Sequence, residues 1–328
     1  MKAVILAGGF GTRLRPLSCT RPKILFPIVN KPLLQRTLES LAQHRIKEAI
    51  LAVDSRTENF IKQHEIPRCG LRLNYSVDPL AKPLGTGGPI RRAEKLLNHD
   101  SFLVLNGDII TDIDYRELLK THEEKEAIAT IALHKVKDPS RYGVAQLKDK
   151  DRIQRFIEKP PKEEAPTNLA NAGVYILSPE IFKYITTGKK VSIERQIFPR
   201  LANQGKLYGH IFDGLWMDMG KLEDYLKINR ILLDSLTNDR EHKIGGEVEV
   251  KRPVAFDKGS SVKERSIIGP YTVLGRNVSV GERVCIQHTV VFPGAQISDC
   301  SFVNQALIGE NVVLGRKVRI GQRCVLGD

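Results

Sequence analysis

From Met1 to about Ser235, short apolar segments alternate with segments whose apolar residues recur at helical spacing. This alternation is expected of a mostly parallel β-sheet covered by helices. The expected strands are 4–7, 49–53, 71–77 and 102–105, and the expected helices are 32–44, 87–97 and 221–236. The hydrophobic pattern therefore predicts an α/β domain with a Rossmann-like, mostly parallel sheet.

The pattern changes between residues 127 and 177. Apolar segments at 127–136, 144–147, 153–157 and 172–177 are joined by turns, with little sign of helix. A run of strands inside an α/β domain predicts a sub-region that covers the substrate.

The C-terminal part of the chain has an apolar residue at every sixth position. The two registers are Val250, Phe256, Val262, Ile268, Leu274, Val280, Ile286 and Phe292, and then Phe302, Ile308, Leu314, Ile320 and Leu326. A period of six is typical of a left-handed parallel β-helix of hexapeptide repeats. The predicted organisation is an α/β domain over 1–236, a linker over 237–249 and a β-helix over 250–328. Cys324 is expected to lie at a core corner of this β-helix.

The charge balance of the chain is basic. Its 328 residues include 51 Lys or Arg and 38 Asp or Glu, which gives a net charge of +13. Such a charge can indicate nucleic-acid binding. Acidic residues are interspersed through most of the chain, however, and no basic tract alternates with aromatic residues. Nucleic acid is therefore not the expected partner.

The sequence shows no signal for a membrane or for an oxidising compartment. No apolar run approaches the roughly 18 residues of a membrane-spanning helix, and the N-terminal segment lacks the pattern of a signal peptide. The five cysteines are odd in number and form no Cys-x-x-Cys pair. We expect reduced thiols, no membrane partner and a cytoplasmic location.

The segment 8–23, Gly-Gly-Phe-Gly-Thr-Arg-Leu-Arg-Pro-Leu-Ser-Cys-Thr-Arg-Pro-Lys, directly follows the first expected strand. Its three glycines allow a tight turn and let backbone N–H groups approach a ligand closely. The segment lacks the third glycine of a dinucleotide fingerprint and the Gly-Lys-Ser/Thr of a P-loop. From Met1 to Leu38 the chain has seven Lys or Arg and no Asp or Glu. These features predict a site for a strongly anionic, phosphate-bearing ligand.

Two aspartates are candidates for a metal site. Asp108 follows the apolar run 102–105 at the carboxyl end of an expected parallel strand, where open α/β sheets bind ligands. Asp218 lies among apolar residues just before the last helix of the first domain. Together they would supply the oxygen ligands that Mg²⁺ needs beside a triphosphate. Taken singly, Asp108 could be a turn residue and Asp218 a helix cap, whereas Asp112 and Asp114 are expected to cap the following helix.

The segment 8–23 resembles the signature of the sugar-1-phosphate nucleotidyltransferases, Gly-Gly-x-Gly-Thr-Arg-Leu-x-Pro-Leu-Ser/Thr-x-x-x-Pro-Lys. By this resemblance Arg13 and Lys23 are the expected catalytic residues, with Lys23 bridging the phosphates and Arg13 holding the departing pyrophosphate. The matching aspartates of the family coordinate the metal, which assigns a Mg²⁺ cofactor to Asp108 and Asp218. The expected nucleotide-binding residues are Leu6, Ala7, Gly8, Gly9, Gly11, Thr12, Arg13, Pro83, Gly85, Thr86 and Asp108.

Three later motifs match the same family in the same order, namely Tyr-Gly-Val at 142–144, Glu-Lys-Pro at 158–160 and Asn-Ala-Gly at 171–173. The resemblance implies that Glu158 and Asn171 meet sugar hydroxyls and that Lys159 meets the sugar phosphate. Gly143 would allow a close backbone approach. The expected sugar-phosphate-binding residues are therefore Gly143, Glu158, Lys159 and Asn171.

Four segments, 83–88, 138–144, 192–199 and 216–221, look most like the guanylyltransferase branch of the family. The implied reaction is Mg²⁺-dependent transfer from GTP to mannose 1-phosphate, giving GDP-mannose and pyrophosphate. The same chemistry on glucose 1-phosphate with UTP, dTTP or ATP stays open. A non-catalytic regulatory scaffold and a sugar-nucleotide sensor also stay open. The expected partners are the triphosphate, the sugar 1-phosphate and, through the β-helix, further copies of the chain.

Overall fold

The computed structural model describes residues 1–9, 11, 14–79, 83–236 and 246–328. The chain divides into two compact units, Met1–Gly9 with Leu34–Trp216, and Phe10–Leu33 with Met217–Asp328. The glycine-rich segment 8–23 is therefore shared, since Gly8 and Gly9 belong to the first unit and the rest of the segment to the second. Most of the predicted linker, residues 237–245, lies outside the described residues.

The first unit is built on a nine-stranded sheet. Its strands are β1 (Ala3–Leu6), β4 (Glu48–Asp54), β5 (Arg72–Asp78), β6 (Phe102–Asn106), β8 (Ala129–Lys135), β9 (Gly143–Leu147), β10 (Ile153–Glu158), β11 (Leu169–Leu177) and β12 (Leu207–Ile211). Strands β5, β4, β1 and β6 are parallel neighbours in that order, and β11 is antiparallel to β6. Beyond β11, strands β8, β9 and β10 form antiparallel pairs, while β12 is parallel to β8. The predicted Rossmann-like, mostly parallel sheet is confirmed, and the strands predicted between residues 127 and 177 form its antiparallel part.

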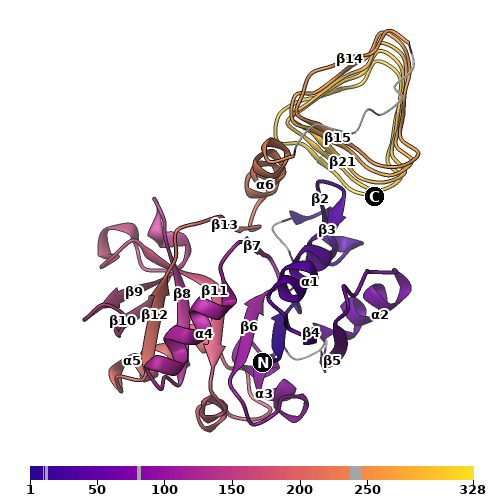
Figure 1. Cartoon of the computed structure of the whole chain (residues 1–328). Coiled ribbons are helices and arrows are strands. Elements are labelled where there is room, and N and C mark those ends of the chain that lie inside the picture. Colours follow the sequence, from indigo (N-terminus) through magenta and orange to yellow (C-terminus); the bar gives the residue numbers. More distant parts are fainter. Residues whose placement is uncertain (10, 12–13, 80–82, 237–245) are drawn as a thin grey trace. The chain divides into compact units, whose positions relative to one another are not determined.

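Helices connect these strands and cover the sheet (Figure 1). They are α1 (Leu33–Gln43), α2 (Ser55–Gln63), α3 (Gly87–Ala93), α4 (Tyr115–Glu124) and α5 (Phe198–Asn203), with the short strands β7 (Ile109–Thr111) and β13 (Trp216–Asp218). The predicted helix 87–97 is shorter than expected, because a 3-10 turn, η4 (Glu94–Leu96), follows α3. Of the two aspartates predicted to cap the following helix, Asp114 is the N-cap of α4 and accepts a hydrogen bond from the Arg116 amide at 2.8 Å, whereas Asp112 is not the N-cap.

The core of the first unit surrounds its parallel strands. Val4, Ile50 and Val104, one from each of three neighbouring strands, are fully buried. Parallel strands with both faces covered consist almost entirely of apolar residues. Polar side chains that serve a ligand are therefore expected at the strand ends rather than along them.

The second unit contains a parallel β-helix with three sheets, whose coils stack around a triangular outline in Figure 1. Its strands are β14 (Glu249–Val250), β15 (Val254–Phe256), β16 (Ser261–Val262), β17 (Ile267–Ile268), β18 (Thr272–Leu274), β19 (Ser279–Val280), β20 (Cys285–Gln287), β21 (Val290–Val291), β22 (Gln296–Ile297), β23 (Phe302–Asn304), β24 (Leu307–Ile308), β25 (Val313–Leu314), β26 (Arg319–Ile320) and β27 (Val325–Leu326). Every third strand is a parallel neighbour in the same sheet, which confirms the predicted β-helix.

Two members of the predicted period of six, Phe292 and Phe302, do not belong to the core cluster of the β-helix, in which Val291 and Val303 lie instead. Phe292 is nevertheless fully buried, against Phe26 and Tyr225. The interior register therefore shifts by one residue, both between Ile286 and Val291 and between Val303 and Ile308. The hydrophobic pattern could not locate these shifts, because two apolar residues are adjacent in the sequence at each place, Val291 with Phe292 and Phe302 with Val303. Cys324 packs against the core, as expected.

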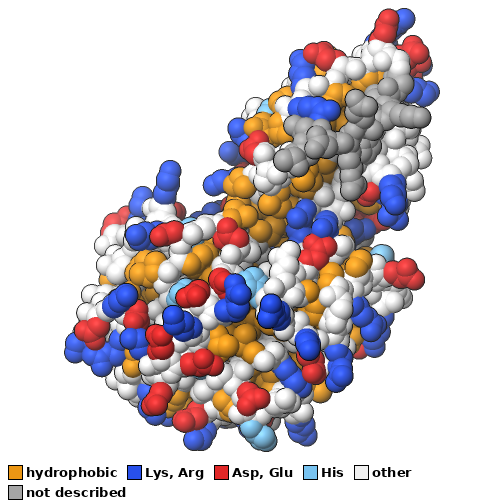
Figure 2. Space-filling model, in the orientation of Figure 1, with side chains coloured by type: hydrophobic (Ala, Val, Ile, Leu, Met, Phe, Trp, Pro, Cys, Tyr) orange, Lys and Arg blue, Asp and Glu red, His pale blue; other side chains and the backbone are white. Residues whose placement is uncertain are grey.

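The second unit also contains α6 (Leu222–Asp234) and a hairpin of β2 (Pro27–Ile28) and β3 (Lys31–Pro32). The turns η2 (Leu17–Cys19) and η3 (Lys23–Leu25) precede the hairpin. Within the described residues, no helix is long and apolar enough to cross a membrane. On the face shown in Figure 2, basic and acidic side chains of the described residues are mixed.

Candidate active site

The predicted nucleotide-binding backbone lies at the carboxyl ends of the central parallel strands. The amide of Ala7 donates to the carbonyl of Ala52 at 2.8 Å, and the amide of Gly107 donates to the carbonyl of Leu6 at 2.8 Å. These bonds hold Gly8 and Asp108 just beyond two neighbouring strands, β1 and β6. A Cβ at Gly9 would meet no atom of the described residues within 4 Å. Packing against the described residues therefore does not require glycine at position 9, which is consistent with a close approach of a ligand to the backbone.

The second half of the glycine-rich segment belongs to the other unit. Gly11 has a φ of 56°, and its carbonyl accepts hydrogen bonds from the Leu14 amide at 2.9 Å and the Ser18 hydroxyl at 2.8 Å. A Cβ at Gly11 would lie 3.5 Å from Cβ of Lys23. The Cβ of Lys23 therefore lies beside the turn at Gly11. Phe10, Thr12 and Arg13 lie outside the described residues.

The two predicted metal ligands are both half-buried, and they belong to different units. Asp108 lies in the turn between β6 and β7, and Asp218 ends β13. Asp218 is not the cap of α6, because the N-cap residue is Lys221, whose amide donates to the Asp224 carboxylate at 3.0 Å. Carboxylate oxygens are ligands that suit Mg²⁺. Among the described residues, no group of three or more His, Cys, Asp or Glu could hold a metal ion by itself, so phosphate oxygens or water would have to complete the ligand set.

The predicted sugar-phosphate residues gather in the antiparallel part of the sheet. Glu158 pairs with Gly143 across β10 and β9, and a Cβ at Gly143 would lie 2.7 Å from Oε2 of Glu158. The same Cβ would lie 2.5 Å from the ring of Phe156. A side chain at 143 would have to displace the Phe156 ring or the Glu158 carboxylate, so glycine at this position leaves the space in which both lie.

Glu158 and Lys159 differ in their exposure to solvent. The Glu158 side chain is 14% exposed and the Lys159 side chain 54%, with Oε1 and Nζ 3.6 Å apart. Burial and the negative charge of Glu194 raise the pKa of Glu158, whereas Lys159 and Arg195 lower it. Lys159 has a φ of 52°, an uncommon conformation for a residue with a side chain. The pair thus offers a shielded acceptor beside an exposed cation, which suits a sugar hydroxyl and its phosphate.

Asn171 is fixed at an irregularity of β11. Its Nδ2 donates to the hydroxyl of Tyr175 at 3.0 Å, and its Oδ1 accepts from the amide of Gly173 at 2.9 Å. Asn106, at the end of β6, also hydrogen-bonds to Tyr175 and would be 2.6 Å from a Cβ at Gly173. Burial and the carboxylates of Glu194 and Glu158 raise the pKa of the Tyr175 hydroxyl, which stays neutral. Asn106 was not predicted as a site residue, although it directly precedes Gly107-Asp108.

Two backbone hydrogen bonds join the predicted base-binding turn, residues 83–88, to Val191. The amide of Gly87 donates to the Val191 carbonyl at 2.8 Å, and the amide of Val191 donates to the Leu84 carbonyl at 3.0 Å. Gly85 has a φ of 74°, and a Cβ there would lie 2.3 Å from the Val191 carbonyl oxygen. Packing therefore requires glycine at 85. The described part of the turn includes the exposed Pro83, and whether a base binds at Pro83, Gly85 and Thr86 stays a prediction.

Glu194 links this turn to the sugar side of the unit. It lies in a π-helical turn, η8 (Ile193–Ile197), a feature often found at functional sites. Its Oε2 accepts hydrogen bonds from the hydroxyls of Thr86 at 2.5 Å and Ser192 at 2.8 Å. Its charge also raises the pKa of Glu158. Sequence reasoning did not name Glu194, although the segment 192–199 carried part of the resemblance.

Aromatic side chains stand beside Gly143. The ring centroids of Tyr142 and Trp216 are 5.0 Å apart in an edge-to-face arrangement, and Trp216 Nε1 donates to the Ala172 carbonyl at 2.8 Å. The indole thereby ties the end of the first unit to β11. Sequence reasoning did not assign this role to Trp216 either.

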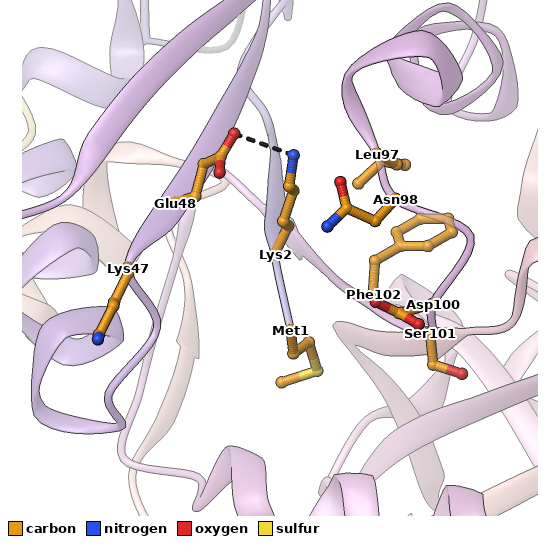
Figure 3. A pocket seen from close by; sticks show the side chains of 9 residues that line it. All are labelled: Met1, Lys2, Lys47, Glu48, Leu97, Asn98, Asp100, Ser101 and Phe102. Atoms are coloured by element: carbon orange, nitrogen blue, oxygen red, sulfur yellow. Dashed lines mark ion pairs between the residues drawn. The ribbon is translucent and has the colours of Figure 1, made fainter.

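A pocket of about 170 Å³ lies at the opposite edge of the sheet, where the parallel strands begin (Figure 3). Lys2 stands in it and pairs with Glu48 at 3.0 Å, while its Nζ also donates to the Leu96 carbonyl at 2.8 Å. Ligands of open α/β sheets bind at the carboxyl ends of the strands. This pocket is therefore not the predicted substrate site.

Two family models match the chain. The model described as nucleotidyl transferase matches residues 2–235, and the model described as GMPPB C-terminal domain matches residues 250–328. The second match agrees with the parallel strands of the β-helix.

Curated proteins and solved structures are also similar. A probable mannose-1-phosphate guanylyltransferase 1 of Oryza sativa subsp. japonica is 36% identical over 90% of this chain and 82% of its own length. The mannose-1-phosphate guanylyltransferase catalytic subunit beta of Danio rerio is 37% identical over 84% of this chain and 74% of its own length. The crystal structure of a putative glucose-1-phosphate thymidylyltransferase from Bacillus anthracis has a TM-score of 0.65 and 25% identity, covering 73% of this chain and 98% of that one. The chain therefore belongs to the nucleotidyl transferase family and is a nucleotidyltransferase.

Proposed function

We propose that the protein transfers a guanylyl group from GTP to mannose 1-phosphate, giving GDP-mannose and pyrophosphate. The similarity to proteins named mannose-1-phosphate guanylyltransferase, which extends over 90% of this chain, carries the choice of substrates. In this reaction a phosphate oxygen of the sugar 1-phosphate attacks the α-phosphorus of the triphosphate, and pyrophosphate leaves. The protein's part is to align two anions and to stabilise the charge of an in-line displacement.

Cations have to separate the two reactants. Two unit charges about 4 Å apart repel by about 4 kcal/mol at an effective dielectric constant near 20. In the proposal Lys23 bridges the phosphates at the reacting centre, Arg13 holds the pyrophosphate, and Lys159 holds the sugar phosphate. The geometry favours Lys159 for this last role, since its ammonium is more exposed than the Glu158 carboxylate that accompanies it.

Asp108 and Asp218 are the residues that would hold Mg²⁺. The bound ion would neutralise charge on the phosphate oxygens beside the site. Glu158 accepts hydrogen bonds from sugar hydroxyls, and the backbone at Leu6, Ala7, Gly8, Gly9 and Gly11 approaches the triphosphate. We further propose the domain boundaries 1–236, 237–249 and 250–328, a homo-oligomer formed through the β-helix, and a cytoplasmic location.

A matrix of substrates tests this function. The protein is incubated with Mg²⁺, each of GTP, ATP, UTP and dTTP, and each of mannose 1-phosphate and glucose 1-phosphate, while pyrophosphate is measured. The proposal predicts the highest kcat/KM for GTP with mannose 1-phosphate. A higher value for another pair would assign the same chemistry to other substrates. Binding of a sugar nucleotide without pyrophosphate release from any pair would identify a sensor or a scaffold.

A further inference from the structure

The loop that bears Lys23 is attached to the β-helix. Residues 10–33 form one compact unit with α6 and the β-helix rather than with the strands that bear Glu158. Residues before and after Lys23 in the sequence contact α6 and the β-helix. Two polar contacts involve residues just before it, and an aromatic cluster and a hairpin follow it.

Before Lys23, the loop contacts the last coils of the β-helix. Arg21 Nη2 donates to Oε2 of Glu310, and the guanidinium lies 5.7 Å from the ring centroid of Phe292. The Arg21 side chain is 11% exposed and that of Glu310 31%. An ion pair that is this well shielded, with a direct hydrogen bond, is stronger than one on an open surface. The Thr20 hydroxyl also donates to Asp328.

After Lys23, the loop is held by aromatic packing. Phe26 is fully buried, with its ring 6.0 Å from that of Tyr225 in α6 and 5.7 Å from that of Phe292 in the β-helix, both edge-on. The Tyr225 hydroxyl donates to the carbonyl of Pro27. Aromatic pairs of this geometry add stabilisation beyond their buried area.

The hairpin that follows is strained and is held by the same elements. Val29 and Asn30 have φ values of 47° and 62°, and positive φ is rare for a β-branched residue such as valine. The Val29 amide donates to Oδ1 of the buried Asn229 at 2.8 Å, and Asn30 Nδ2 donates to the Leu274 carbonyl at 3.0 Å. Strained backbone of this kind persists when surrounding contacts fix it.

We propose that the β-helix positions Lys23 for catalysis, and that Glu310 is a positioning residue that acts through Arg21. The proposal rests on the proposed function, because it needs Lys23 at the reacting phosphates. Neither Arg21 nor Glu310 is assigned a contact with substrate. The β-helix would then set the turnover of the enzyme by fixing the loop at residues 21 and 26, on either side of the lysine.

A charge exchange tests the proposal. Arg21→Glu and Glu310→Arg each place like charges in contact, whereas the double variant restores an opposite pair. We expect each single variant to lower kcat by about tenfold or more, while KM for mannose 1-phosphate changes by less than about threefold. The double variant should recover kcat to within about threefold of the wild type. Glu223→Gln, which removes an exposed partner of Arg323 at 3.7 Å in the same unit, is the matched control and should leave kcat unchanged.

Hydrogen exchange gives a readout that needs no activity. The amides of Leu25 and Phe26, bonded to the carbonyls of Pro22 and Lys23 at 2.9 and 3.0 Å, should exchange faster in both single variants and return to wild-type rates in the double variant. Unchanged exchange and kcat in the single variants would overturn the proposal, as would a double variant no better than either. A wild type without pyrophosphate release, but with the expected exchange pattern, would contradict the proposed function and leave the attachment of the loop intact.

Discussion

Alanine at two glycines should separate the role of ligand binding from the role of packing. Gly9 and Gly85 both belong to the predicted nucleotide site, but their surroundings differ. Among the residues that the structure describes, a Cβ at Gly9 would meet no atom within 4 Å, whereas a Cβ at Gly85 would lie 2.3 Å from the Val191 carbonyl oxygen. Gly85 also has a φ of 74°, which disfavours any residue with a Cβ.

The structure gives the expected magnitudes. For Gly85→Ala, left-handed backbone costs about 1–2 kcal/mol, and forcing a methyl group into occupied space costs about 1–3 kcal/mol. The free energy of unfolding should therefore fall by about 2–5 kcal/mol. For Gly9→Ala it should change by less than about 0.5 kcal/mol, as at other sites without contacts. The Gly9→Ala methyl group would instead stand where the phosphates approach, so kcat/KM for GTP should fall by about tenfold or more.

Urea unfolding followed by circular dichroism, together with pyrophosphate release at varied GTP, measures both effects. Gly70→Ala is a useful control for backbone strain alone, since Gly70 has a φ of 79° and no atom within 4 Å of its added Cβ. Full activity of Gly9→Ala would refute the phosphate role of this backbone. If the Gly85→Ala protein were no less stable than the Gly70→Ala protein, the tight packing of Val191 against Gly85 would be refuted.

Three further predictions concern charged groups. The charge of Glu194 raises the pKa of Glu158, while Lys159 and Arg195 lower it. Glu194→Gln should therefore move the acid limb of the pH profile of kcat/KM for mannose 1-phosphate to lower pH, whereas the control Glu180→Gln should not. An acid limb that does not move in Glu194→Gln would contradict the coupling of the two carboxylates. Burial raises the pKa of Asp78 from 3.8 to about 6, so folding disfavours its ionised form and wild-type stability should fall as pH rises from about 4 through 6. Asp78→Asn should therefore stabilise the protein at pH 7.5, by about 1 kcal/mol once solvent screening and the lost ion pair with Arg92 at 3.6 Å are allowed for, and have no such effect below pH 4, as urea titrations can measure. Lys23→Ala should lower turnover at least about tenfold with a nearly unchanged thermal melt; a parallel loss of folding would make Lys23 a structural residue.

Much of the fold follows from the hydrophobic pattern, because buried parallel strands and stacked β-helix coils both impose strong periodicity. The pattern misses α2, in which only Thr57 and Ile61 are buried, since so few core contacts give almost no periodic signal. The period of six also includes Phe292, although Val291 belongs to the β-helix core and Phe292 packs against Phe26 and Tyr225 instead.

The site is predictable where a motif is local and less so where it depends on distant contacts. The glycines, Lys23 and the Glu158-Lys159 pair stand in short motifs whose spacing carries the chemistry. Thr86 hydrogen-bonds to Glu194, and Gly85 packs against Val191. In each pair the two residues are more than 100 positions apart, so no local spacing in the sequence indicates these contacts. The contact between Arg21 and the β-helix could not be predicted from a local motif either, since Arg21 and Glu310 are 289 residues apart.

We propose that Asp108 and Asp218 bind the same divalent ion, and a double-mutant cycle in Mg²⁺ dependence is the sharpest test of this proposal. Pyrophosphate release is measured against Mg²⁺ concentration for the wild type, Asp108→Asn, Asp218→Asn and the double variant. Ligands of one ion act as a unit, so each single change should raise the half-saturating Mg²⁺ concentration at least about tenfold, and the double variant should be little worse than either. Independent effects that multiply in the double variant, or single variants with wild-type Mg²⁺ dependence, would contradict the shared site.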